Sequence, residues 1–208
     1  MTGRIVVAVL LSYLVGAIPT SYLVMRALRG IDLRRTGSGN LGATNLYRSL
    51  GWRYAIPVAL FDMLKGALPV LVLGPWAGLS HTSSILLGLV AVAGHVFSVF
   101  LHFRGGKGVA TSGGVVLGLA PGAFAVALIV WAIIVKVSGY VSLASIGAAI
   151  VLPVATWFLA PERRNLVPWL ALLGILVVWL HRGNIGRLLK GTENRFGRRA
   201  PPKPGAAA

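Results

Sequence analysis

Apolar runs separated by short polar stretches make up most of the chain. Because a helix rises roughly 1.5 Å per residue, a run of about 20 apolar residues spans a bilayer. The pattern predicts membrane helices over residues 5–25, 54–73, 84–103, 109–120, 122–135, 141–159 and 166–180. Those over 109–120 and 122–135 are predicted to be short, because Pro121 and Gly122 interrupt that stretch. The predicted fold is an all-α, polytopic membrane helix bundle of about seven helices, two of them short.

Composition supports a membrane protein, and the distribution of charge predicts its orientation. Of the 208 residues, 56% are hydrophobic and 12% are charged, whereas about a quarter of a soluble domain is charged. Lys and Arg outnumber Asp and Glu by 20 to 4, and they gather after the first apolar run and after residue 181. Since cytoplasmic loops are enriched in Lys and Arg, we expect the N-terminus outside and the C-terminus in the cytoplasm. Seven crossings agree with this, although Arg163 and Arg164 then lie outside, against the usual bias.

The chain divides into an integral membrane domain over residues 1–195 and a basic, proline-rich tail over residues 196–208, which we expect to be disordered. The first apolar run lacks an Ala-x-Ala cleavage pattern, so we interpret it as a retained helix. The sequence contains no cysteine, which excludes disulfides, a thiolate nucleophile and cysteine metal ligands.

Two glycine-rich stretches have the character of anion-binding loops. The first runs from Ser38 to Asn45, with Arg48 one turn later, and combines backbone N–H groups with short polar side chains. The second, over residues 104–111, places Lys107 among three glycines and is a potential anion nest. It is not a Walker loop, because a glycine and a hydroxyl of that pattern are missing. Either stretch alone could also be an ordinary turn between helices.

A third polar stretch follows the last apolar run, so the predicted topology places all three at the cytoplasmic face. It begins with His181 and Asn184, which share one face if the helix continues. Two other features allow more than one interpretation. Asp62 and Lys65 lie three residues apart in an apolar run and form either a structural ion pair or a support beneath the active site. His95 and His102 are either packed near a helix end or catalytic.

The three stretches contain specific motifs in a fixed order. They read Ser38-x-Asn40-x-Gly42-Ala43-Thr44-Asn45-x-x-Arg48, then Gly105-Gly106-Lys107-Gly108-Val109-Ala110-Thr111, then His181-x-x-Asn184-Ile185-x-Arg187-Leu188 with Gly191-x-Glu193. Together they resemble the motifs of the bacterial acyl-phosphate:glycerol-3-phosphate acyltransferase family. The resemblance covers the chain to about Arg195. One small departure lies before the second motif, where Ser98 follows Phe97 in place of the expected proline.

The resemblance implies the reaction. A long-chain acyl phosphate would donate its acyl group to the 1-hydroxyl of sn-glycerol 3-phosphate, giving 1-acyl-sn-glycerol 3-phosphate (lysophosphatidic acid) and phosphate, the first step of bacterial phospholipid synthesis. It also implies no metal, no other cofactor and no nucleic acid. The location it implies is the bacterial cell (inner) membrane, with the active site at the cytoplasmic face. A soluble enzyme that makes acyl phosphate from acyl carrier protein is a candidate partner.

The resemblance also implies the site residues. The motif positions carried over as catalytic are Ser38, Arg48, Lys107, His181 and Asn184. Those carried over as substrate-binding are Gly39, Asn40, Gly42, Thr44, Asn45, Gly105, Gly106, Gly108, Thr111, Arg187 and Glu193. The chemistry agrees, because two phosphate-bearing substrates need cations and glycine-rich backbone.

The expected mechanism is direct transfer without an acyl-enzyme, because phosphate already leaves well from a mixed anhydride. Either His181 or the donor phosphate takes the hydroxyl proton, and Ser38 is assigned to phosphate or carbonyl binding rather than to attack. A His-x-x-x-x-Asp motif is absent from the sequence, and four acidic residues make a Ser-His-Asp triad improbable. The alternative from another class is a transporter or flippase of an anionic phosphate-bearing substrate, since broken helices and intramembrane charge also suit transport. A weaker alternative assigns nucleic-acid or anionic-lipid binding to the basic tail.

Overall fold

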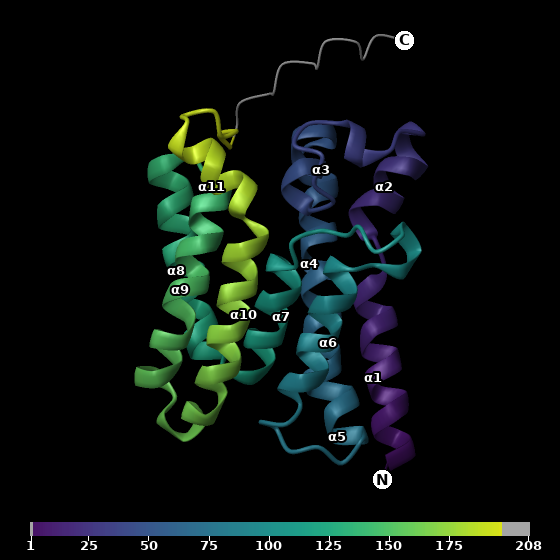
Figure 1. Cartoon of the computed structure of the whole chain (residues 1–208), viewed down its shortest axis with the longest axis vertical. Helices are drawn as coiled ribbons and strands as arrows, with labels where there is room; N and C mark the ends of the chain where they lie inside the picture. The colour runs from purple at the N-terminus through teal and green to yellow at the C-terminus, as the bar shows by residue number, and fades with distance from the viewer. Residues whose placement is uncertain (1, 197–208) are drawn as a thin grey trace.

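The computed structural model describes residues 2–196, and every regular element in that range is helical (Figure 1). The longer helices are α1 (Thr2–Ala17), α2 (Thr20–Arg29), α3 (Ala43–Leu50), α4 (Trp52–Leu68), α6 (Ile85–Val96), α7 (Val109–Leu119), α8 (Pro121–Ser138), α9 (Val141–Leu159), α10 (Val167–Leu180) and α11 (Arg182–Leu189). Short turns are η1 (Leu33–Arg35), η2 (Pro69–Leu73), α5 (Gly74–Trp76), η3 (Val99–Leu101) and η4 (Pro161–Leu166). The predicted disordered tail lies, apart from its first residue, outside the described residues.

The bundle of about seven membrane helices predicted from the sequence is confirmed. Within residues 2–196, 5 stretches are long and apolar enough to cross a membrane: Thr2–Arg29, Trp52–Trp76, Pro121–Ser138, Val141–Leu159 and Pro161–Leu180. Two shorter apolar stretches, Ile85–Leu101 and Val109–Leu119, complete the set.

The prediction of which two helices are short was wrong in one case. α8 is not a short helix but runs 18 residues from Pro121, which stands in its first turn, where a missing N–H costs nothing. The short partner of α7 is instead α6, which has 12 residues and stops at Val96. At about 1.5 Å per residue α6 is roughly 18 Å long, well short of a bilayer core of about 30 Å.

The chain between α6 and α7 therefore lies part-way along the bundle. Figure 1 shows this teal segment below the level of α3 and α11, on the half of the molecule away from α5. It contains η3 and an irregular stretch over residues 102–108. Irregular backbone at this depth must have its polar groups satisfied inside the protein. Phe103 donates its N–H to the Ser98 carbonyl (2.8 Å), and Gly105 donates to the Val96 carbonyl (2.9 Å).

Close approach of helix backbones holds the bundle together. Where α4 crosses α7, a Cβ on Gly66 would overlap the Thr111 carbonyl and a Cβ on Gly114 would overlap the Met63 carbonyl. Only glycine permits this spacing, which is how helices pack where lipid supplies little hydrophobic drive. The largest buried apolar cluster joins α6 and α7 to α8, α9 and α10, and includes Val92, Val115, Val116, Leu119, Ala123, Leu152, Leu166, Leu170 and Leu173.

One end of the bundle carries the polar motifs. Figure 1 shows α2, α3 and α11 together at this end, while the N-terminus and α5 lie at the opposite end. The first span breaks between α1 and α2 at Ile18 and Pro19, which have no helical assignment. The loop before α3, the segment before α7 and the turn after α10 thus approach one another from three separate parts of the chain.

Candidate active site

The second and third motifs meet at Lys107 and Asn184. Lys107 precedes Gly108, the N-cap of α7, and its ammonium group donates a hydrogen bond to Asn184 Oδ1 on α11. The amide of Asn184 is oriented from its other side, since Nδ2 donates to Glu193 Oε1 (2.6 Å). The contact between Lys107 and Asn184 joins residues 77 positions apart in sequence.

Glu193 organises this end of the site. Its Oε1 accepts from Asn184 and from the Ser142 hydroxyl (2.9 Å), and its Oε2 accepts from Arg187 Nε (2.7 Å). Although burial raises the pKa of this carboxyl, the hydrogen bonds from Asn184, Arg187 and Ser142 bring the pKa below its ordinary value, so Glu193 is ionised at neutral pH. A carboxylate whose oxygens bind protein donors is poorly suited to hold an anionic substrate. Its position fits an organising role better than the substrate contact suggested by the sequence.

Arg48 connects the first motif to the third. On α3, its Nη2 donates to the Asn194 carbonyl (3.3 Å), and the neighbouring Tyr47 ring stacks on Phe196 with centroids 4.6 Å apart. The Nε of Arg48 is buried and has no hydrogen-bond partner among the described residues. Burial lowers the pKa of Arg48, yet a guanidinium stays charged at neutral pH. A buried donor without a partner is costly unless a ligand satisfies it.

His181 has the protonation state of a base. It is 3% exposed, and its Nδ1 lies 2.7 Å from the Val177 carbonyl. Because a carbonyl only accepts, Nδ1 carries the hydrogen and Nε2 keeps its lone pair. Burial, and then the charge of Lys107, lower the pKa of His181 to about 4. At neutral pH the imidazole is therefore uncharged and can accept a proton.

The first motif forms a loop held by Asn45. Its Oδ1 accepts from the Ser38 N–H (2.9 Å), while its Nδ2 donates to the carbonyls of Leu33 (3.2 Å), Thr36 (3.1 Å) and Asn40 (3.0 Å). Because both N–H groups of the Asn45 amide and one lone pair of its oxygen are bound within the loop, Asn45 has no donor left for a phosphate and its main role is to shape the loop. Ser38 lies exposed on that loop.

Other positions of the first motif lie within this loop or in the start of α3 that follows it. Gly39 has φ +72° and donates its N–H to the Thr36 carbonyl (2.9 Å), so its backbone is committed to the turn. Gly42 is the N-cap of α3, and Thr44 lies half-buried in the first turn of that helix.

Two of the three glycines of the second motif have no free N–H for the anion nest that the sequence suggested. The N–H groups of Gly105 and Gly106 donate to the carbonyls of Val96 (2.9 Å) and His95 (3.1 Å) at the end of α6. Gly108 has φ +69° and is the N-cap of α7. Gly105 and Gly106 thus serve close approach and Gly108 serves a turn, and the charged side chain of this motif is that of Lys107. Thr111 is also placed elsewhere, because its hydroxyl lies 3.2 Å from His95 Nδ1 inside the bundle.

Comparison with known proteins identifies the family. The sequence model of glycerol-3-phosphate acyltransferase matches residues 6–191. The chain belongs to the glycerol-3-phosphate acyltransferase family.

Relatives with this family's name align with the chain over nearly their whole length. The chain is 48% identical over 205 residues to glycerol-3-phosphate acyltransferase 1 of Deinococcus radiodurans, covering 95% of this chain and 98% of the relative. It is 42% identical over 188 residues to the enzyme of Fusobacterium nucleatum, covering 90% and 96%. A crystal structure of PlsY, an integral membrane glycerol 3-phosphate acyltransferase in its glycerol 3-phosphate form, aligns with a TM-score of 0.84 at 42% identity, covering 92% of this chain and 95% of that one. The lysophosphatidic acid form aligns with a TM-score of 0.83.

The chain is therefore an integral membrane enzyme, and the transporter alternative is set aside. Within residues 2–196, no group of three or more His, Asp or Glu side chains could hold a metal ion.

Sequence reasoning missed several partners of the site in this acyltransferase. Ser142, which binds Glu193, stands in the first turn of α9, where it resembles any serine in a membrane helix. The Asn194 carbonyl, which binds Arg48, is a backbone atom and has no signal in the sequence. His102 lies exposed at φ +54° in the segment between α6 and α7, so nothing assigns it to catalysis.

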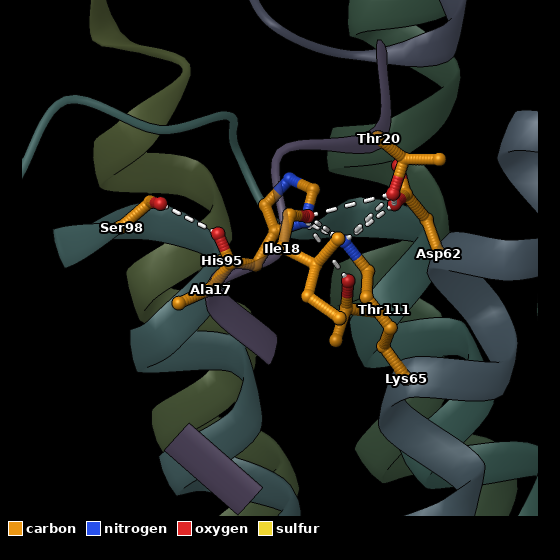
Figure 2. Close-up of polar contacts among 8 residues, drawn as sticks. All are labelled: Ala17, Ile18, Thr20, Asp62, Lys65, His95, Ser98 and Thr111. Carbon is orange, nitrogen blue, oxygen red and sulfur yellow. Dashed lines mark hydrogen bonds and ion pairs between the residues drawn. The ribbon is translucent and has the colours of Figure 1, made fainter. Parts of the chain in front are cut away.

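The intramembrane charges form an ion pair beneath these motifs. Lys65 Nζ lies 2.6 Å from Asp62 Oδ1, and both side chains are buried. Figure 2 shows that Lys65 also reaches the break in the first span, donating to the Ile18 carbonyl (2.8 Å), while Thr20 donates to Asp62 (3.1 Å). The pair satisfies backbone that the break leaves without a helical partner, so it has a structural role here.

Proposed function

We propose that this acyltransferase moves a long-chain acyl group from acyl phosphate to the 1-hydroxyl of sn-glycerol 3-phosphate, forming lysophosphatidic acid and phosphate. The observation that carries the proposal is the excess of positive charge in a partly buried site. Lys107, Arg48 and Arg187 surround a single carboxylate, Glu193. Two substrates that each carry a phosphate would balance this excess, whereas a thioester donor would not bring a phosphate to the reacting carbonyl.

The proposed chemical step is a direct transfer. The 1-hydroxyl oxygen attacks the acyl carbonyl carbon, the bond from that carbon to the phosphate oxygen breaks, and phosphate leaves with the electron pair. His181 Nε2 is available to take the hydroxyl proton, because Nδ1 is committed to Val177. The donor phosphate is the other group able to take it. Asn184 and Lys107 hold the phosphates, and alignment of hydroxyl and carbonyl supplies up to about 7–11 kcal/mol of the barrier reduction.

An assay with purified protein in detergent tests the donor. Glycerol 3-phosphate is incubated with acyl phosphate, acyl-CoA or acyl carrier protein carrying the same chain, and lysophosphatidic acid is measured by mass spectrometry. The proposal expects product from acyl phosphate alone. Equal or greater product from either thioester would overturn it. Adding the soluble enzyme that makes acyl phosphate from acyl carrier protein should restore product formation with the carrier protein.

Labelling with radioactive acyl phosphate tests direct transfer. The enzyme is incubated with the donor alone and denatured within one turnover. We expect no acyl group on the protein. An acyl group recovered on Ser38, formed and consumed at the rate of turnover, would replace direct transfer by a covalent route.

Binding of glycerol 3-phosphate should weaken as pH rises through about 8. Burial lowers the pKa of Lys107 to about 8, Glu193 opposes this shift, and Arg187 and Arg48 add to it. Lys107 is thus charged below that pH and neutral above it, so the attraction to phosphate is lost at high pH. We expect KM to rise roughly tenfold or more between pH 7 and 9.5. Lys107→Arg, which keeps its charge, should show a flat profile, and a rise of equal size in that variant would contradict the assignment.

The proposed location is the bacterial inner membrane with the active site at the cytoplasmic face. The absence of cysteine from the sequence allows a direct test by single-cysteine variants. Glu162→Cys lies in η4, at the end opposite α11, and Gly183→Cys lies in the first turn of α11. An impermeant thiol reagent added to intact cells should label Cys at 162 and spare Cys at 183 until the cells are opened. The reverse labelling pattern would show that the protein has the opposite orientation in the membrane.

A further inference from the structure

His95 connects the buried ion pair to the loop that carries Lys107. Its Nδ1 faces Lys65 Nζ at 3.4 Å and the Thr111 hydroxyl at 3.2 Å (Figure 2). Lys65 is 1% exposed and is itself fixed by Asp62 and by the Ile18 carbonyl. The imidazole is thus held on one edge by groups from α4 and α7.

These neighbours determine which nitrogen of the His95 ring carries the hydrogen. A lysine ammonium only donates, so Nδ1 is the acceptor and Nε2 carries the hydrogen. The Thr111 hydroxyl can donate to the same Nδ1, since hydroxyl groups rotate. The Nε2 edge therefore lies on the side of the ring away from the ion pair.

The Nε2 edge contacts the backbone next to Lys107. A Cβ at Gly106 would overlap His95 Nε2, and it would lie 3.3 Å from the Leu41 carbonyl of the first motif. Gly106 also donates its N–H to the carbonyl of His95 (3.1 Å). Backbone and ring of one residue thus hold Gly106, and the residue that follows it is Lys107.

We propose that His95 is a positioning residue, whose ring, held by Lys65 and Thr111, contacts Gly106 and so determines where Lys107 stands relative to Asn184. The inference rests on the proposed function, because it concerns placement of the lysine assigned to phosphate binding. His95 acts through Lys107 and takes no part in the transfer itself. The ion pair of Asp62 and Lys65 thereby gains a role beneath the active site in addition to its structural one.

A steric rescue tests the contact. Gly106 does not have a positive φ, so alanine fits its backbone, and its cost arises where the methyl meets the His95 ring. Displacing Lys107 by about 1 Å should lower kcat/KM for glycerol 3-phosphate by roughly tenfold to a hundredfold in Gly106→Ala. Combining this change with His95→Ala removes the overlap, so the double variant should be several times more active than Gly106→Ala alone. It should also regain part of any loss in the midpoint of thermal unfolding.

Gly105→Ala is the matched control. Its methyl would overlap the backbone carbonyl of His95, which no side-chain change can move away. His95→Ala should therefore fail to rescue Gly105→Ala. His95→Gln, whose amide reaches the position of Nε2, should keep more activity than His95→Ala when tested alone.

The outcomes separate this inference from the proposed function. Additive losses at positions 95 and 106, or equal rescue of Gly105→Ala, would overturn the positioning role, while Lys107→Ala would still show its large loss of activity. Full activity of Lys107→Ala would instead overturn the role of Lys107, and the inference with it.

Discussion

Lys107→Ala should lower kcat/KM for glycerol 3-phosphate by about 30- to 1000-fold, which corresponds to ~2–4 kcal/mol for a charge-assisted contact to phosphate in a partly desolvated site. Lys107 is the cation that the Gly-rich segment brings directly to Asn184. Its loss leaves the Asn184 carbonyl oxygen without this donor and removes one positive charge from the site. Steady-state kinetics with acyl phosphate and glycerol 3-phosphate, on protein purified in the same detergent, measure the effect.

The matched control for this change is Lys136→Ala. Lys136 lies exposed in the last turn of α8 and carries the same charge. It should change kcat/KM less than about twofold, since exposed charges act weakly through solvent. Losses of similar size in both variants would show that overall positive charge, and not the position of Lys107, supports activity.

Lys65→Met should produce the largest loss of stability. It leaves the Asp62 carboxylate buried without its cation, and breaking a buried pair in this way costs about 3–5 kcal/mol. The Ile18 carbonyl at the break of the first span loses its donor in the same variant. Unfolding in mixed detergent micelles, followed by circular dichroism, measures the change in free energy.

Two further variants test the cause of that loss. Replacing both partners, Asp62→Asn with Lys65→Met, removes the unpaired charge and should recover most of the stability. Arg163→Met is the comparison variant. It breaks a solvent-accessible ion pair with Glu162 and removes a hydrogen bond to the Leu119 carbonyl, and it should lower the free energy of unfolding less than Lys65→Met does. A double variant as unstable as Lys65→Met alone would mean that packing of the lysine chain, rather than its charge, is what matters.

The number of helices could be predicted from the lengths of the apolar runs and the distribution of charge, but the length of α6 could not. Residues 97–103 continue the apolar run and yet leave the α-helix, and Phe97, Phe100 and Phe103 are exposed on the protein surface. An apolar run without periodicity does not determine the backbone conformation. The cause of the departure is the return of Gly105 and Gly106 to the carbonyls of Val96 and His95. That pairing is tertiary and has no pattern within the segment itself.

In the candidate site, too, the sequence identified the residues of each motif but not their partners from distant parts of the chain. The family resemblance of the motifs implied Lys107, Asn184 and Arg48, and the structure brings these stretches together at one end of the bundle. The roles within each motif needed the structure. The Asn45 amide N–H groups bind carbonyls of its own loop. Glu193 accepts hydrogen bonds from several donors, one of which is Ser142, 51 residues away. A sequence shows which groups are present but not which donors and acceptors are already occupied.

The shortness of α6 and α7 also bears on how the enzyme meets its substrates. Because the segment that carries Lys107 lies below the level of α3 and α11, part-way along a bundle whose longer helices can cross a membrane, we expect the site to sit near the depth of the lipid headgroups. An amphiphilic donor diffusing laterally in the leaflet would present its phosphate at that depth, while the water-soluble acceptor enters from the aqueous side. Catalysis would then follow interfacial kinetics, in which the rate depends on the mole fraction of donor in the bilayer, and adding inert lipid at constant total donor would slow the reaction by surface dilution.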